Sequence, residues 1–210
     1  MPQLMIGYGS LIDEASRRRT VPDAVEALPV TVHGYRRTWG HRMDAVGYIG
    51  ATTFLTAVPD ATAALNGVAF EMPEERLSAL DLRERGYHRQ RLEPGQSRMA
   101  VPPHDVLDAD TWIYVRDPDE LRPPDEQYPI IQSYVDVCMT GCIDIAQSHP
   151  NACGDFARDF VDTTDGWSER WVNDRLYPRR PQRDVPHARE IDTILRELLP
   201  DQFAAIRIDR

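Results

Sequence analysis

The segment Gly7-Tyr8-Gly9-Ser10-Leu11 is the short stretch whose residue types point most directly to chemistry. Glycines on both sides of an aromatic residue allow the backbone to adopt positive φ angles and to turn its N–H groups outward. Outward amides of this kind bind an anion, or the oxyanion of a reaction intermediate. An ordinary tight turn is the alternative, and the pentapeptide alone does not exclude it.

A second candidate is Glu84, which follows a segment with helical periodicity. Residues 73–86 predict a helix, with a proline and two carboxylates in its first turn and a glycine at its end. Leu77 and Leu80 precede Glu84 at helical spacing, so the leucines would carry it to the edge of a core. Two alternatives stay open: Asp81 as the reactive carboxyl group, and Glu84 as a member of a surface ion pair.

Other residue types that carry chemistry give weaker patterns. Ser10 lacks the G-x-S-x-G context of a nucleophile, so we expect it to donate hydrogen bonds to a substrate. The six histidines form no i,i+4 pair, and no zinc site is expected. Cys138 and Cys142 lie one helical turn apart and are expected to be buried thiols. We therefore expect no metal and no cofactor.

Composition narrows the class of protein. The chain has 210 residues, of which 41% are hydrophobic, and a net charge of −10. This charge argues against a nucleic-acid partner, which would need clustered lysine and arginine. No apolar run approaches the ~20 residues of a membrane helix, and the N-terminus does not resemble a signal peptide. With three cysteines and no disulfide pattern, the cytoplasm is the expected compartment.

The elements that must position the loop and Glu84 are mostly strands. Apolar and β-branched runs predict strands at 4–6, 30–35, 48–58, 68–71 and 111–115. Asn66-Gly67 predicts a tight turn between the third and fourth of these. The resulting plan is a catalytic domain over residues 1–118.

Beyond a proline-rich stretch the chain changes character. Periodic apolar residues predict helices at 130–146, 152–160, 168–176 and 187–199. Residues 119–210 are therefore expected to form a helical extension, which either packs against the core or provides the surface of a homodimer.

Three motifs, taken together, resemble a known family. They are the loop at residues 7–11, Gly34-Tyr35-Arg36-Arg37, and Leu80-Asp81-Leu82-Arg83-Glu84 followed by Gly86-Tyr87. In this order they resemble the γ-glutamylcyclotransferase-like superfamily, which includes ChaC-type and AIG2-like proteins. The resemblance covers about residues 4–116, and three motifs in the right order are more specific than any one of them.

The resemblance implies an α+β fold, built on a small, partly closed β-barrel with flanking helices. It also implies that Tyr8, Gly9, Ser10 and Leu11 bind the glutamyl part of a substrate through backbone amides, and that Glu84 is the catalytic acid/base. Tyr87 matches an aromatic residue of the family, and Arg36 lies where family members carry Tyr-Arg pairs. Both are expected to bind substrate.

The implied reaction is the cyclisation of a small γ-glutamyl substrate to 5-oxoproline, with release of an amine. The α-amine attacks the γ-carbonyl of the same molecule, so positioning removes much of the entropic barrier. Glu84 would take a proton from the amine and later deliver one to the leaving nitrogen, as general acid–base catalysis requires.

Two other hypotheses remain open. The chain can be a non-catalytic module that binds a small carboxylate, because Thr38-Trp39-Gly40-His41-Arg42 matches the ChaC-type pattern only in part. Alternatively, the same fold and the same base can perform acyl transfer or hydrolysis on a related amide.

Overall fold

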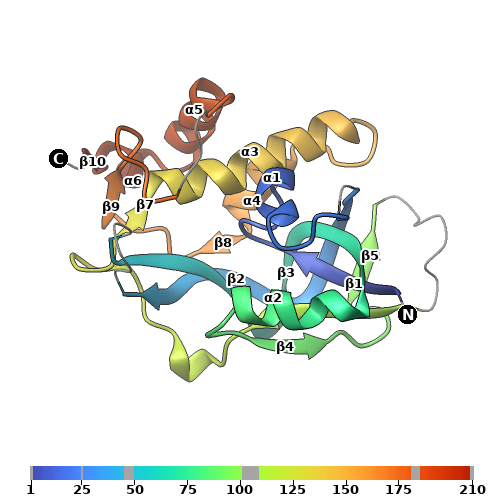
Figure 1. Cartoon of the computed structure of the whole chain (residues 1–210). Coiled ribbons are helices and arrows are strands. Elements are labelled where there is room, and N and C mark those ends of the chain that lie inside the picture. Colours follow the sequence, from blue (N-terminus) through green and yellow to red (C-terminus); the bar gives the residue numbers. More distant parts are fainter. Residues whose placement is uncertain (1, 25, 45–49, 101–108, 181–184, 209–210) are drawn as a thin grey trace.

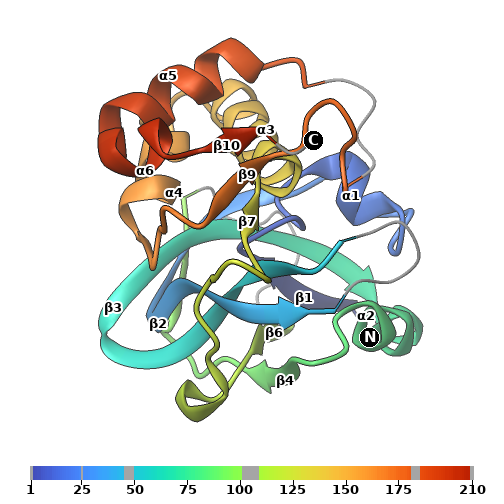
Figure 2. The same cartoon turned by 90° about the vertical axis from the view of Figure 1, so that its left-hand side faces the viewer.

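The computed structural model describes residues 2–24, 26–44, 50–100, 109–180 and 185–208. Its fold is mixed α+β: strands form a large curled sheet, and the longer helices gather on one side of it (Figures 1 and 2). No helix within these ranges is long and apolar enough to cross a membrane.

The large sheet has seven strands in the order β4-β6-β1-β3-β2-β5, with β8 paired to β2. Its strands are β1 (Pro2–Gly7), β2 (Leu28–Met43), β3 (Thr52–Pro73), β4 (His88–Arg91), β5 (Ser97–Met99), β6 (Asp110–Val115) and β8 (Thr164–Asp165). The strands predicted at 4–6, 30–35 and 111–115 are confirmed as parts of β1, β2 and β6. Residues 48 and 49 of the strand predicted at 48–58 lie outside the described ranges, and most of the remainder belongs to β3.

The long strand β3 makes the sheet curl. It pairs with β2 over most of its length, and its second half pairs antiparallel with β1. Its first half meets the end of β6, where Ala57 pairs with Val115 and the Arg116 amide donates to the Ala57 carbonyl at 3.0 Å. Since β6 also pairs with β1, the strands fold back toward one another around the sheet interior.

The turn predicted at Asn66-Gly67 is wrong, because β3 passes through both residues without a break. Asn66 is 8% exposed, and its side chain bonds to Arg37 and to the Phe156 carbonyl. A Cβ at Gly67 would lie 2.6 Å from the carbonyl oxygen of Gly7. Tertiary packing, rather than turn geometry, therefore explains why an asparagine and a glycine occupy these two positions.

The helices lie before, between and after these strands. They are α1 (Glu14–Arg18), the 3₁₀ turn η1 (Glu74–Arg76), α2 (Leu77–Arg83), the 3₁₀ turn η2 (Pro118–Glu120), α3 (Gln132–Ser148), α4 (Phe156–Asp162), α5 (Ala188–Leu198) and α6 (Pro200–Ala204). Helices α3, α4 and α5 overlap the helices predicted at 130–146, 152–160 and 187–199.

The second half of the chain is not wholly helical, which corrects the expected helical extension. A three-stranded sheet is formed there by β7 (Ile130–Ile131), β9 (Trp171–Asn173) and β10 (Arg207–Ile208). The helix predicted at 168–176 is wrong, because β9 occupies its centre and pairs with strands on both sides. This segment buries Trp171 completely, and neighbouring strands rather than i,i+4 bonds satisfy its backbone.

Apolar side chains cover both faces of the large sheet. Along β1, Met5 belongs to a cluster shared with α3, α4 and α5, whereas Ile6 belongs to a second cluster within the curled strands. This alternation follows from the two-residue period of a strand. The first cluster joins residues from both halves of the chain, and the division expected at residue 118 stays a prediction.

Candidate active site

Glu84 reaches the site from the C-terminal end of helix α2 and does not lie on a face of the helix. The helix stops at Arg83, and Glu84 is its C-cap, with its amide bonded to the Leu80 carbonyl at 2.9 Å. Gly86 has φ +96°, a conformation that favours glycine and ends the helix. Leu80 is fully buried, so the end of the helix is anchored to the core as the spacing predicted.

Two cavities meet at Glu84. The outer cavity has a volume of about 420 Å³, and a small inner one of about 30 Å³ lies behind it. The residues that line both are Ser10, Glu84, Tyr87 and Tyr134. Tyr8, Gly9 and Leu11 line the inner cavity, so the structure brings the predicted loop together with Glu84 and Tyr87.

The loop at residues 7–11 is a turn closed by a hydrogen bond from the Ile12 amide to the Gly9 carbonyl at 2.9 Å. Buried arginines bind its carbonyls: Arg37 donates to Tyr8 O, and Arg17 donates to Leu11 O and Ile12 O. In a trans peptide the N–H points opposite to the C=O, so the Gly9 amide points away from Arg37. Within the described ranges, the amides of residues 9–11 have no hydrogen-bond acceptor.

The two loop glycines do not adopt positive φ, which corrects the expectation from the sequence. They are required by close approach instead. A Cβ at Gly7 would lie 2.8 Å from the Leu11 Cβ, and a Cβ at Gly9 would lie 2.9 Å from the Tyr134 hydroxyl. The loop is therefore packed tightly between its own next turn and helix α3.

Glu84 is a largely buried carboxyl group, with its side chain 19% exposed. Burial raises its pKa above the ordinary value, and the nearby guanidinium groups of Arg83 and Arg180 oppose this shift. Burial prevails because it disfavours the charged form of a carboxyl group. A carboxyl group with a raised pKa can both accept and donate a proton near neutral pH.

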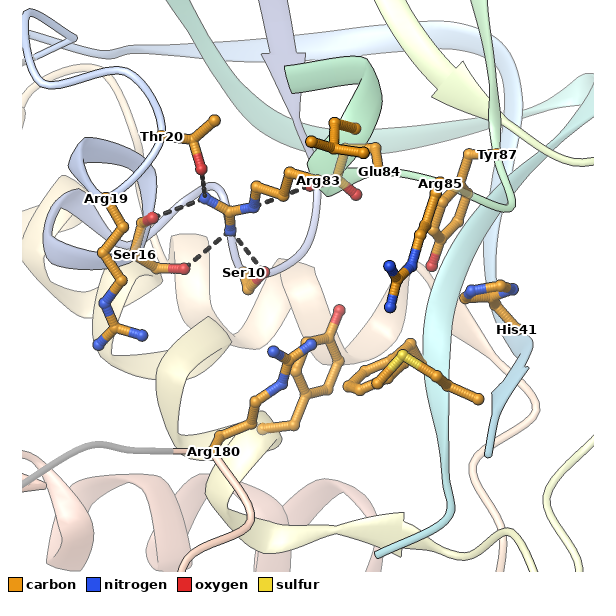
Figure 3. A pocket seen from close by; sticks show the side chains of 14 residues that line it. Ser10, Ser16, Arg19, Thr20, His41, Arg83, Glu84, Arg85, Tyr87 and Arg180 are labelled. Atoms are coloured by element: carbon orange, nitrogen blue, oxygen red, sulfur yellow. Dashed lines mark hydrogen bonds and ion pairs between the residues drawn. The ribbon is translucent and has the colours of Figure 1, made fainter. Parts of the chain in front are cut away.

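Arg83 connects the end of α2 to the loop and to α1 (Figure 3). Its Nε lies 3.0 Å from a Glu84 carboxylate oxygen. Its other nitrogens donate to the Ser16 carbonyl at 2.6 Å, to the Ser16 hydroxyl at 3.0 Å, and to the hydroxyls of Ser10 and Thr20 at 3.3 Å each. These contacts fix the orientation of Glu84 relative to the loop.

Tyr87 and His41 form the wall beside Glu84. The Tyr87 hydroxyl donates to the Leu55 carbonyl at 2.8 Å, and its ring lies 4.4 Å from that of His41. Burial, followed by the charge of Arg116, lowers the pKa of His41 to about 4. Arg116 donates to His41 Nδ1 at 2.7 Å, because a guanidinium group cannot accept. The neutral ring therefore carries its proton on Nε2.

The alternative carboxyl group, Asp81, and the predicted substrate-binding residue Arg36 lie outside both cavities. Asp81 accepts a hydrogen bond from the Tyr114 hydroxyl at 2.7 Å and pairs with Arg89 at 3.1 Å, and it lines neither cavity. Arg36 pairs with Asp60 at 3.3 Å and with Asp165 at 3.2 Å. The structure does not bring Arg36 to either cavity.

Several residues that line the cavities or hold the loop were not predicted from the sequence. Arg37, rather than its neighbour Arg36, contacts the loop, and strand alternation was a usable signal because adjacent arginines face opposite sides. Tyr134 and Arg180 come from the second half of the chain, and no motif distinguishes them. The described part of the chain holds no group of three or more His, Cys, Asp or Glu side chains suited to a metal ion.

Comparison with known proteins shows which family this chain belongs to. The family described as gamma-glutamyl cyclotransferase, AIG2-like, matches residues 5–133. A solved structure described as "Gamma-glutamyl cyclotransferase" shares the fold, with a TM-score of 0.53 and 12% identity over 94% of this chain and 99% of that one.

A second solved structure, of uncharacterized protein loc79017 from Homo sapiens, has a TM-score of 0.51 and 14% identity. The match covers 93% of this chain and 98% of that one. No curated protein sequence matches the chain significantly. The family match extends over more than half of the 210 residues and includes both the loop and Glu84. The chain therefore belongs to the AIG2-like gamma-glutamyl cyclotransferase family.

Proposed function

We propose that this protein cyclises a γ-glutamyl compound to 5-oxoproline and releases an amine, with Glu84 as the general acid/base. The observation that carries the proposal is the position of Glu84, a largely buried carboxyl group lining both cavities beside the loop of residues 8–11. Membership of the family supports the same reaction type.

In the proposed reaction the α-amine of the substrate attacks its own γ-carbonyl carbon. A proton passes from this amine to Glu84 as the new C–N bond forms. The carbonyl oxygen becomes an oxyanion, which the amides of residues 9–11 would stabilise. Glu84 then protonates the leaving nitrogen, the old C–N bond breaks, and the carbonyl reforms. No water is consumed, and the carboxylate is regenerated.

The electrostatics of the site suit this cycle. Burial raises the pKa of Glu84, which makes its carboxylate a stronger base toward the substrate amine. Arg83 binds the carboxylate at 3.0 Å and so limits its rotation. General acid–base help from one such group is worth ~10²–10⁴-fold in rate. Tyr8, Ser10, Leu11 and Tyr87 complete the proposed glutamyl pocket.

Two broader expectations belong to this proposal. The curled sheet with its own apolar interior is consistent with the partly closed barrel implied by the family resemblance. A cytoplasmic location and a purely small-molecule substrate are likewise proposed. Arg36 has no part in the proposed pocket, because its two ion pairs lie on the outside of the fold.

The test is the release of 5-oxoproline from γ-glutamyl amino acids, glutathione and γ-glutamyl amines by wild type and by Glu84→Gln. We expect the variant to lose ~10²–10⁴-fold in kcat with little change in KM, since only proton transfer is removed. Glu75→Gln is the matched control, because Glu75 is exposed in the turn before α2. Equal activity of wild type and Glu84→Gln would remove Glu84 from the mechanism.

The same assay separates the alternative functions. Hydrolysis would give free glutamate, which is heavier than 5-oxoproline by one water. A non-catalytic binding module would be stabilised thermally by γ-glutamyl compounds without converting any of them. Either result would overturn the proposed cyclisation.

A further inference from the structure

The outer cavity has an unusual charge for this protein. Its described lining carries four guanidinium groups, from Arg19, Arg83, Arg85 and Arg180, and a single carboxylate, that of Glu84. The chain as a whole has a net charge of −10. A cationic cavity in an acidic protein favours an anionic ligand, because low-dielectric walls strengthen the local field.

Arg180 is held in place by a buried network at the start of α3. Asp174, 1% exposed, accepts hydrogen bonds from the Ser133 amide at 2.7 Å, the Ser133 hydroxyl at 2.6 Å and the Arg179 amide at 2.8 Å. The Ser133 hydroxyl in turn accepts from the Arg180 amide at 3.1 Å. The backbone that carries Arg180 is therefore fixed relative to the cavity.

The Arg180 side chain lies over aromatic rings and forms no direct ion pair in the described part of the chain, although its charge acts on nearby Glu84. Its guanidinium carbon is 4.4 Å from the Phe54 ring centre and 5.7 Å from that of Tyr134. Its Nε atom is buried and makes no hydrogen bond within the described residues. Stacking on two rings orients the guanidinium plane and leaves its nitrogens for a planar acceptor such as a carboxylate.

Arg85 faces Arg180 across the same space. Figure 3 shows the two side chains extending from opposite sides below Glu84. Among the residues that the structure places, none forms an ion pair with Arg85. Arg83, by contrast, is already paired with Glu84. Arg85 and Arg180 thus remain available to bind an anionic ligand in the cavity.

The γ-glutamyl group alone cannot satisfy this charge, because it brings one carboxylate and an amine. Resting on the proposed function, we propose that the leaving group is an acidic amino acid with two carboxylates, as in γ-glutamyl-glutamate or γ-glutamyl-aspartate. Arg180 and Arg85 are then specificity-determining residues that bind the carboxylates of the leaving group. The two carboxylates of such a leaving group would match the two guanidinium groups of Arg180 and Arg85 in the cavity.

The test compares γ-glutamyl-glutamate with γ-glutamyl-glutamine, two peptides of equal size that differ in one carboxylate. We expect kcat/KM for 5-oxoproline release to be about tenfold higher with γ-glutamyl-glutamate than with γ-glutamyl-glutamine. The lowest kcat/KM is expected with γ-glutamyl-lysine. The preference should weaken with added salt, as a cationic cavity predicts. Equal kcat/KM for the two peptides would overturn the inference while leaving the proposed cyclisation intact.

Arg180→Met should bring the ratio between the two peptides close to one, chiefly by raising KM for the glutamate peptide. Arg85→Met should act in the same direction, and because Arg85 is exposed the variant is expected to fold normally. Arg98→Met is the matched control, an exposed arginine on β5 that lines neither cavity. A preference that survives in both cavity variants would contradict the assignment of these residues.

A binding measurement keeps the inference testable if no peptide is cyclised. The dissociation constants of the two peptides are then measured directly by calorimetry with wild-type protein and with Arg180→Met. Tighter binding of the glutamate peptide, lost in the variant, would support the anionic pocket although the proposed cyclisation had failed. Equal binding of both peptides would refute the inference.

Discussion

Replacing Arg37 by methionine tests how the loop is held. The Arg37 side chain is completely buried, and burial lowers its pKa to about 10. Its five N–H groups are shared among six acceptors: the Tyr8 carbonyl, the Asn66 carbonyl and side chain, the Phe160 carbonyl, and the hydroxyls of Thr163 and Thr164. It also lies 3.9 Å from the centre of the Phe160 ring.

The expected loss of stability follows from the acceptors left behind. Thr164 also donates to the Phe160 carbonyl at 2.6 Å, so that acceptor keeps a partner. The Tyr8 carbonyl and the Asn66 oxygens lose a charged donor, and each buried acceptor left unsatisfied costs ~1–3 kcal/mol. Removing a buried charge offsets part of this. We expect Arg37→Met to lower the free energy of unfolding by ~3–5 kcal/mol.

Arg36→Met is the matched control, one residue away on the same strand. Arg36 is 35% exposed and forms two surface ion pairs, so its loss should cost no more than about 1 kcal/mol. Urea unfolding measures both free energies, and thermal melts should show a difference in Tm of ~4–20 °C between the two variants. Arg37→Met should also lower activity, because the Tyr8 carbonyl fixes the direction of the Gly9 amide. Equal destabilisation by the two variants would refute this reasoning.

Two further predictions concern the site. Because burial raises the pKa of Glu84, its contribution to stability is present below the ordinary value of 4.5 and is lost as the pH rises through the folded-state value. Glu84→Gln should therefore be more stable than wild type at pH 7, with the difference closing below pH 4.5. Thermal melts across this range decide, and a variant less stable than wild type at pH 7 would contradict the prediction. Gly9→Ala should lose ~1–3 kcal/mol because its Cβ would lie 2.9 Å from the Tyr134 hydroxyl. Adding Tyr134→Phe to Gly9→Ala should restore much of the lost Tm. If the double variant had the same Tm as Gly9→Ala alone, that result would argue against this contact.

The elements that could be predicted were those whose signal is local. The strand before the loop, the helix that ends at Glu84, and most of the helices after residue 130 follow from periodicity and end signals within a few residues. A short motif pointed to Glu84 and Tyr87, and both residues line the two cavities. The loop was found for a partly wrong reason: its glycines serve close packing against Leu11 and Tyr134, and not positive φ.

The failures have a common physical cause. Asn66-Gly67 has the composition of a turn, but pairing with β2 and hydrogen bonds from a buried arginine keep it extended. Residues 168–176 were predicted as a helix, yet their central part bonds to strands that are distant in sequence. In both cases hydrogen bonds from remote segments outweighed local preference, which a single sequence does not report.

The sequence by itself therefore predicted two groups that the structure brings together, a loop with available amides and a carboxyl group at a helix end. Only the tertiary structure decided their surroundings: the burial that raises the pKa of Glu84, the choice of Arg37 over Arg36, and the arrival of Arg180 from the far end of the chain. Composition and spacing act over a few residues, whereas burial and charge at a site depend on every segment that packs around it.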